Sequence, residues 1–325
     1  MTVLPHPSAR SLARRVPRAG LRLLLMLGLL LAALGYRAAT AAPTATITVT
    51  TTGDTLDAAA GNCAAITIAS LPGPDGQTSL REAICAANNT AGADTITFSV
   101  NGTFTLTRTG VEDDNVTGDL DLLSNITITG NGAGNTVLDG NNTDRVFDID
   151  PLQGSNAVVS ISGVTIQHGH ADPSTFNLGA GVATGASSTV TISNSTITNN
   201  NSVGGTGGGI EAFGALTLNT VTVSNNTADA LGGGIRAIRT LTINNSTITG
   251  NTAEGGGGLW LGSGNGITMN VTDSTIAGNH SVDRPSNPNN LFDGGGLYID
   301  TDGSVTIQRS TISGNDAARN GGGIF

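Results

Sequence analysis

The chain contains no lysine, few aromatic residues and few charges. All 14 basic residues are arginine, aromatic residues make up 3% of the 325 residues, and charged residues make up 12% where about a quarter is typical. Six arginines but none of the 24 acidic residues precede residue 42, so the remainder carries eight arginines against 24 acids, a net charge of about −16. Because nucleic acids and anionic membranes bind through lysine and arginine, we expect neither as a partner.

The first 41 residues differ from the rest in lacking acidic residues altogether. Arginines between Arg10 and Arg22 precede the apolar run Leu23–Leu34, and Ala39-Thr-Ala41 supplies small residues suited to cleavage. The apolar run is short for a membrane span. We therefore predict a signal peptide over residues 1–41, no membrane span in the mature chain, and a secreted or cell-surface protein. The alternative is an uncleaved N-terminal anchor.

Only two cysteines are present, Cys63 and Cys85. An even count in an exported chain favours one disulfide between them, which would close a loop of about 22 residues and stabilise the fold by about 3 kcal/mol.

Glycine, by contrast, is abundant, with 47 residues. Many of these glycines occur as triplets, one in each unit of a sequence repeat. Each repeat contains an apolar-Thr-apolar run, a run such as Ser-Thr-Ile-Thr, an asparagine, and Gly-Gly-Gly followed by an apolar residue. Both runs alternate β-branched residues with period two, which is typical of short strands. A fixed period predicts a stacked repeat architecture. The central apolar residues, at intervals of 26, 25, 28 and 36, are Ile197, Val223, Ile248, Ile276 and Ile312.

One such coil cannot bury its own apolar residues, so the coils must stack in parallel at roughly 4.8 Å. One asparagine per coil would then form an amide ladder at a corner. We therefore predict an all-β fold, a right-handed parallel β-helix over residues 126–325, with handedness taken from the usual chirality of parallel crossovers. The ladder residues are Asn200, Asn226, Asn251, Asn279 and Asn315.

A single helix is predicted, over Ser79–Asn88. Ser79 and Glu82 have the spacing of a capping box, and Leu80 and Ala83 begin one apolar face. A short amphipathic helix suits the open apolar end of a solenoid. We therefore assign residues 42–125 to an N-terminal cap and the first strands.

The segment Thr78-Ser-Leu-Arg-Glu-Ala-Ile84 with Ala-Ala-Asn88 resembles the CSLREA domain found at the N-terminus of exported bacterial β-helix proteins. The resemblance covers roughly residues 46–100 and implies export and a surface role. The leading cysteine of that motif is Thr78 here. The repeats over about 160–325 are also similar to those of polymorphic outer-membrane proteins, although the C-terminal barrel of those proteins is missing here.

Pectin-degrading enzymes also use β-helix folds, so catalytic clusters need consideration. The elements Asn142-Thr-Asp144, Asp113-Asp114 and His168-Gly-His170 resemble those of polygalacturonases but occur in another order, and no lysine is available. A lyase needs a strong base, usually arginine or lysine, beside a calcium site that makes the sugar C–H more acidic. Asp144, Arg145 and Asp148 are the candidates for that role; the alternative is an arginine that neutralises nearby carboxylates.

An acidic loop supplies candidate calcium ligands, because Ca²⁺ prefers clustered oxygen ligands. The candidates are Asp113, Asp114 and Asp119, without the spacing of an EF-hand. A solvated acidic loop is the alternative, and we predict no obligatory cofactor.

The residue after each Gly-Gly-Gly-apolar unit should face outward. In the last three repeats this residue is Trp260, Tyr298 and Phe325. Stacked, exposed aromatic residues suit sugar rings or a protein partner. We therefore expect a non-catalytic adhesion or binding protein for a polysaccharide or surface protein; the alternative is a polysaccharide lyase or glycoside hydrolase. A second outward column, of threonines such as Thr196 and Thr198, resembles that of ice-binding β-helices.

Overall fold

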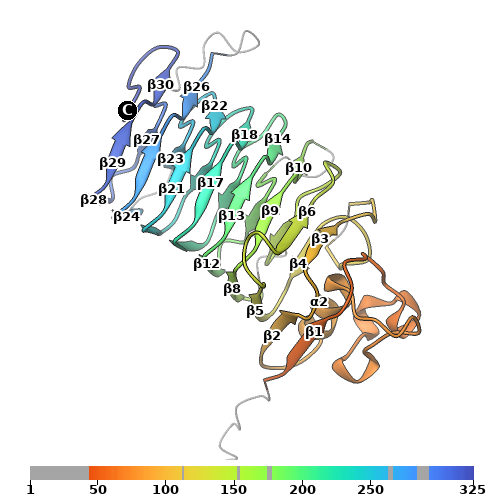
Figure 1. The fold of residues 1–325 in the computed structure, drawn as a ribbon. Coiled ribbons are helices and arrows are strands. Elements are labelled where there is room, and N and C mark those ends of the chain that lie inside the picture. The colour runs from red at the N-terminus through yellow and green to blue at the C-terminus, as the bar shows by residue number, and fades with distance from the viewer. Residues whose placement is uncertain (1–43, 112, 152–153, 174–177, 263–265, 284–292) are drawn as a thin grey trace, which may run out of the picture. The chain divides into compact units, whose positions relative to one another are not determined.

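The computed structural model describes residues 44–111, 113–151, 154–173, 178–262, 266–283 and 293–325. Residues 42–325 form one compact unit. The predicted signal peptide lies outside the described residues. Within that unit, successive coils of the chain stack along one axis, from the cap around α2 to the last strands β27–β30 (Figure 1).

The described strands form four sheets, in which every pairing is parallel. The nine-stranded and eight-stranded sheets run nearly the whole length of the solenoid. The nine-stranded sheet contains β1 (Thr46–Val49), β2 (Ala93–Phe98), β5 (Asn125–Thr129), β8 (Val158–Ser162), β12 (Thr189–Ser193), β16 (Ala215–Asn219), β20 (Leu241–Asn244), β24 (Thr268–Thr272) and β28 (Ser304–Gln308). The eight-stranded sheet contains β3 (Gly102–Thr105), β6 (Thr136–Asp139), β9 (Thr165–Gln167), β13 (Thr196–Thr198), β17 (Thr222–Ser224), β21 (Thr247–Thr249), β25 (Thr275–Ala277) and β29 (Thr311–Ser313).

Two smaller sheets complete each coil. The six-stranded sheet contains β10 (His170–Ala171), β14 (Asn201–Ser202), β18 (Thr227–Ala228), β22 (Thr252–Ala253), β26 (His280–Ser281) and β30 (Asp316–Ala317). The seven-stranded sheet contains β4 (Leu120–Leu122), β7 (Phe147–Ile149), β11 (Val182–Thr184), β15 (Ile210–Ala212), β19 (Ile235–Ala237), β23 (Leu259–Gly262) and β27 (Leu297–Asp300). The predicted parallel β-helix is confirmed.

The core lies inside the coils. Alternation sends every second residue of a strand inward, where Val190, Leu216 and Leu241 stack in register in the nine-stranded sheet. Ile197, Val223 and Ile248 do the same in the eight-stranded sheet. All are at most 1% exposed, so the apolar ladders exclude water along the solenoid.

The asparagine ladder forms as predicted. The side-chain amide of Asn226 donates to Asn251 Oδ1 at 3.0 Å and to the backbone oxygen of Ile197 at 3.0 Å. The backbone N–H of Asn226 also donates to Asn251 Oδ1, at 2.9 Å. The pattern repeats from Asn200 to Asn315. Each buried amide thus satisfies the backbone at a corner where a coil turns away from the sheet.

The glycine triplets meet two separate demands. The first glycine, such as Gly207 with φ 64°, adopts the left-handed conformation that the corner requires. The second and third have no room for a side chain: a Cβ on Gly208 would lie 2.3 Å from the backbone oxygen of Thr227, and one on Gly209 would lie 2.5 Å from that of Gly234. Glycine is therefore required for the coils to approach each other closely.

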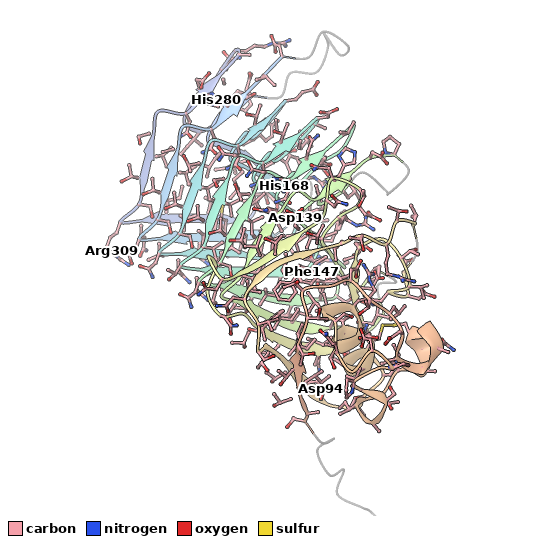
Figure 2. The ribbon with its side chains drawn as sticks, turned by 45° about the vertical axis from the view of Figure 1, so that its right-hand side comes forward. Asp94, Asp139, Phe147, His168, His280 and Arg309 are labelled. Atoms are coloured by element: carbon pink, nitrogen blue, oxygen red, sulfur yellow. A yellow bond between two sulfur atoms is a disulfide. The ribbon has the colours of Figure 1, made fainter. Side chains whose placement is uncertain are left out.

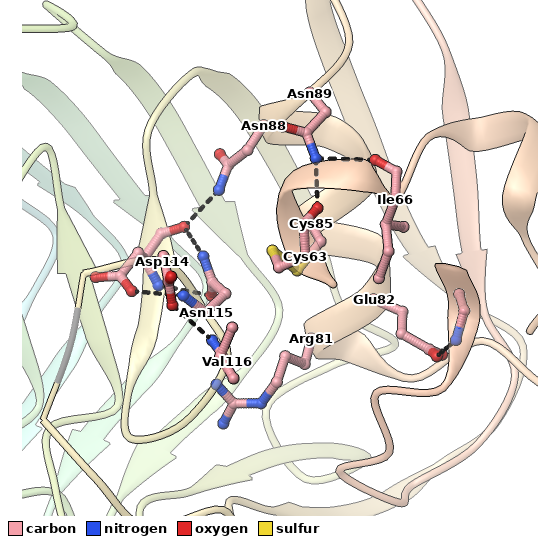
Figure 3. Close-up of a disulfide and its surroundings, with 12 residues drawn as sticks. Cys63, Ile66, Arg81, Glu82, Cys85, Asn88, Asn89, Asp114, Asn115 and Val116 are labelled. Atoms are coloured by element: carbon pink, nitrogen blue, oxygen red, sulfur yellow. Dashed lines mark hydrogen bonds between the residues drawn. A yellow bond between two sulfur atoms is a disulfide. The ribbon is translucent and has the colours of Figure 1, made fainter. Parts of the chain in front are cut away.

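The cap contains α2 (Leu80–Asn88) and the short 3₁₀ helices η1 (Ala58–Gly61), η2 (Cys63–Ala65) and η3 (Ile68–Ser70). The predicted capping box is present: Ser79 Oγ accepts from the Glu82 N–H, and Glu82 accepts from the Ser79 N–H. The predicted disulfide joins Cys63 to Cys85, with their Cα atoms 5.3 Å apart. Figure 3 shows it beside Asn89, whose amide donates to the backbone oxygens of Cys63 and Ile66.

Arg81 attaches the cap to the first coils. Its guanidinium is fully buried, pairs with Asp54 at 2.7 Å, and donates to the backbone oxygens of Gly118 and Asp119 at 2.8 and 2.9 Å. Asn88 reinforces the attachment by donating to the oxygen of Asp121 at 2.8 Å (Figure 3). The helix therefore closes the apolar end of the solenoid and positions the acidic loop that precedes β4.

Candidate functional site

The outward side of the seven-stranded sheet carries one column of charged and aromatic side chains. Successive residues of a strand point to opposite faces of the sheet, so the two neighbours of each residue in this column point inward. Ile210 and Ala212, on either side of Glu211, are examples. The parallel register places the members on successive coils. From the cap onward they are Asp121, Asp148, Ala183, Glu211, Arg236, Trp260 and Tyr298, with Phe325 following through the bridge between Leu297 and Ile324.

Near the cap, three carboxyl groups gather around Arg145. Its Nε lies 2.7 Å from Asp119 Oδ2, and one of its terminal nitrogens lies 2.9 Å from Asp148 Oδ2. Asp144 Oδ1 accepts from the backbone N–H of Arg145 at 2.8 Å. All four residues are at least nine-tenths buried. The structure thus brings together the three residues that the sequence suggested as a catalytic cluster, and adds Asp119.

The proton affinity of this cluster is unusual. Burial, together with the nearby charge of Asp119, raises the pKa of Asp144 to about 7. Burial also raises the pKa of Asp148 to about 7, against the attraction of Arg145. For Asp119, burial again raises the pKa against that attraction. Arg145, with a smaller contribution from Arg81 at Asp119, cannot neutralise so many carboxylates in a poorly solvated place, so the group retains protons near neutral pH.

Arg145 itself stays charged. Burial would lower its pKa, but the attraction of Asp119 and Asp148 outweighs burial and raises it. An arginine in this state holds the carboxylates in place and cannot act as a base.

A pocket of about 260 Å³ opens beside the cluster. It lies against β7 and β11, where the small Ala183 of the column leaves space between Asp148 and Glu211. The walls combine charged groups with apolar ones: Asp113, Arg145 and Asp148, with Pro151, Leu178, Ala183, Thr184, Gly185 and Phe213. Such a mixture suits a small polar ligand with an apolar face.

The remainder of the column is a continuous stack. The guanidinium of Arg236 lies 5.8 Å from the ring centroid of Phe213 and 4.9 Å from that of Trp260. Trp260 and Tyr298 stack at 6.1 Å with an interplanar angle of 11°, and Tyr298 and Phe325 stack at 5.3 Å and 26°. Buried Glu211 pairs with Arg236 and accepts from Thr206 Oγ1 at 2.6 Å. Phe213 belongs to both features, so the pocket and the stack adjoin.

The predicted stacking of the three aromatic residues is confirmed, but their predicted exposure is wrong for Trp260. Phe325 is 47% exposed, whereas Trp260 is 3% exposed because Arg236 covers one face of its ring and Tyr298 the other. The indole Nε1 of Trp260 is buried and has no hydrogen-bond partner. The accessible part of the stack is therefore its end at Tyr298 and Phe325.

Sequence reasoning missed Phe213. It follows Glu211 by two residues, so the alternation that places Glu211 outward places Phe213 outward too. The prediction considered only the residue that follows each Gly-Gly-Gly-apolar unit, and Phe213 lies two residues beyond that position.

The predicted calcium ligands are not assembled into a site. Asp119 pairs with Arg145, Asp113 lines the pocket, and exposed Asp114 accepts from the Val116 N–H at 3.3 Å. In the part of the chain that the structure describes, no group of three or more His, Cys, Asp or Glu residues is placed to hold a metal ion.

The His168-Gly-His170 segment lies elsewhere, on the eight-stranded and six-stranded sheets. His168 Nδ1 lies 2.9 Å from Asp139 Oδ2, and the two residues are labelled in Figure 2. Although burial opposes it, hydrogen bonds from Gln167 and His168 lower the pKa of Asp139. This pair is not part of the pocket lining, so it does not complete a polygalacturonase-like constellation.

Comparison with protein families adds one result to this geometry. A model of the right handed beta helix region matches residues 109–312, more than half of the chain. The chain belongs to the right-handed β-helix family. No match is found among curated proteins or among solved structures.

All pocket residues of this β-helix fall inside the matched range, as do Trp260 and Tyr298. Membership is compatible with both surface binding proteins and pectin-degrading enzymes, so it does not choose between the two predicted functions. Over the described residues, no helix has both the length and the apolar character needed to cross a membrane.

Proposed function

We propose that this β-helix is an exported surface or secreted protein that binds polysaccharide along the outward column of its seven-stranded sheet. The observation that carries the proposal is the junction of a ring-sized pocket with an aromatic stack at Phe213. Sugar rings present apolar faces to aromatic side chains and hydroxyl groups to charged ones, and this surface offers both in a row. The charged N-terminal region and the CSLREA-like cap support export.

Binding to a glycan array tests this proposal, with Phe213→Ala and Tyr298→Ala as the variants. Each should weaken binding about 3- to 10-fold, since an aromatic contact contributes about 0.5–1.5 kcal/mol. Val158→Ala is the matched control, because Val158 is an exposed apolar residue on the nine-stranded sheet, 55% accessible. Binding that survives both column substitutions, or that the control weakens equally, would contradict the proposal.

A second candidate, cleavage of a glycan, is favoured by one observation. Asp144 and Asp148 both have pKa values raised to about 7, the range in which a carboxyl group can donate and accept a proton at neutral pH. The release of reducing or unsaturated ends from pectin-like polymers, and its loss in Asp148→Asn, would support this candidate. Unchanged polymer after prolonged incubation would leave binding as the function.

A further inference from the structure

The charge of the pocket restricts what it can hold. Asp113 and Asp148 line it, and the neighbouring carboxyls of Asp119 and Asp144 also surround Arg145. Three buried carboxyl groups thus surround the guanidinium of Arg145, and the half-buried carboxyl group of Asp113 lies beside them in the pocket wall. A ligand carrying a carboxylate or a phosphate would add a further negative charge.

Among the described residues that line the pocket, Arg145 is the one cation, and it is already paired with two carboxyl groups. Arg145 gives Nε to Asp119 and a terminal nitrogen to Asp148, at 2.7 and 2.9 Å. Releasing it toward an anionic ligand would leave the carboxyl group of Asp119, which is 1% exposed, without the cation that contacts it directly. Breaking a buried ion pair in this way is strongly unfavourable.

From this we infer that the pocket takes a sugar bearing a protonated amine, such as a glucosamine unit, rather than a uronic acid. The inference rests on the proposed function, since it names the class of glycan bound at the same site. The ammonium would lie against the carboxyl groups of Asp113 and Asp148, where its positive charge would favour their ionised forms, and the sugar ring would lie against Phe213. An ammonium ion is compact and supplies three donors, so it can bridge two carboxylates without displacing Arg145.

The size and shape of the pocket agree with one ring. Its volume of about 260 Å³ lies below the ~300–1,000 Å³ of sites for drug-sized molecules. Leu178, Pro151 and Phe213 supply apolar wall, which a bare cation site would not need.

The test compares four disaccharides binding to the full chain in a chelating buffer at about 0.15 M salt, where charges more than about 8 Å apart are screened. The probes are the glucosamine disaccharide, its fully N-acetylated form, digalacturonate and cellobiose. Disaccharides avoid the nonspecific attraction that a long polycation would feel for an acidic protein. We expect the glucosamine disaccharide to bind at least about tenfold more tightly than its N-acetylated form, and digalacturonate to bind least.

Asp113→Asn and Asp148→Asn should each remove most of this preference. Asp113 is half-buried, so its substitution tests the site even if Asp148→Asn perturbs folding. Asp114→Asn is the control, because it removes the same charge one residue away from the pocket lining. Equal losses in Asp113→Asn and Asp114→Asn would assign the preference to overall charge and overturn the inference.

The failure of this inference is distinguishable from that of the proposed function. Equal binding of the amine and N-acetyl disaccharides, or stronger binding of digalacturonate, would overturn the inference and leave glycan binding in place. Binding of none of these probes, together with no binding to a glycan array, would overturn both.

Discussion

At the scale of single residues, the asparagine ladder shows how one side chain can stabilise several coils. Asn251 Oδ1 accepts from both the backbone and the side chain of Asn226, and its Nδ2 donates to Asn279 and to the oxygen of Val223. Asn251 is fully buried, so each of these groups depends on it rather than on water.

Asn251→Ala should therefore lower the free energy of unfolding by about 3 kcal/mol, since it leaves several buried groups without partners at about 1–3 kcal/mol each. Urea titration followed by circular dichroism measures the change. Thr249→Ala in the same coil is the control; Thr249 faces outward and should change stability by less than about 0.5 kcal/mol. Similar values for the two variants would contradict the role of the ladder.

The pKa values of Asp144 and Asp148 predict an unusual dependence of stability on pH. Both rise from 3.8 to about 7 on folding, so between these values the folded chain holds more protons than the unfolded chain. The stability that these groups contribute is therefore greatest at low pH and falls as the pH rises toward 7, by up to about 4 kcal/mol for each group.

The midpoint of urea unfolding should accordingly decrease between about pH 5 and pH 8. Asp148→Asn should flatten this decrease, because an amide does not titrate. A midpoint that stays constant or rises over the same range would contradict the raised pKa values of these carboxyl groups.

At the scale of elements, the cap is joined to the first coils by side-chain hydrogen bonds and ion pairs that do not repeat along the solenoid. The polar residues of Ser79-Leu-Arg-Glu82 make separate contacts. Ser79 begins the helix, Arg81 contacts the first coils, and Glu82 accepts from the N–H groups of Asp57 and Ala58 at 2.9 Å each. Leu80 is 4% exposed and lies in the core. The motif is therefore explained by docking, without any reaction at the cap.

The disulfide should contribute to this docking. Replacing both Cys63 and Cys85 by serine should lower the free energy of unfolding by about 3 kcal/mol, because the bridge spans 22 residues. Denaturant titration with and without dithiothreitol measures it, and reduction of the unsubstituted chain should give the same loss. No difference in either experiment would mean that α2 and its hydrogen bonds hold the cap alone.

At the scale of the whole molecule, burial is uneven along the solenoid. Inward residues of central coils, such as Ile243 and Ile248, are inaccessible to solvent, whereas Ile307 and Ile312 in the last described coil are half-buried. In stacked repeats each coil is stabilised chiefly by its neighbours, so a coil with one neighbour opens more readily.

In a chain that ends at residue 325, backbone amides of β28 and β29 should therefore exchange hydrogen at least about tenfold faster than those of β20 and β21. Mass spectrometry of peptides covering residues 241–249 and 304–313 measures this difference. Equal protection of the two segments would mean that the last coil is covered in solution, for example by a second copy of the chain.

The repeat made most of the fold predictable. Period-two runs of Thr, Ile and Val, one asparagine and one glycine triplet per coil are local signals, and stacking similar coils converts them directly into parallel sheets, an amide ladder and close packing. The capping box of α2 was equally local. The partners of Arg81 were not predictable, because they lie 27 to 38 residues away in loops that have no period.

In the candidate site, too, some features follow from local sequence signals and others depend on contacts between distant residues. The sequence by itself determined that Trp260, Tyr298 and Phe325 share one outward register, because alternation and the period require it. Only the tertiary structure decided that Arg236 and Tyr298 enclose Trp260, that Asp119 joins Asp144 and Asp148 around Arg145, and that Ala183 leaves a pocket beside Phe213. Register follows from spacing along the chain, whereas burial, proton affinity and cavities depend on which distant side chains fill the space around a group.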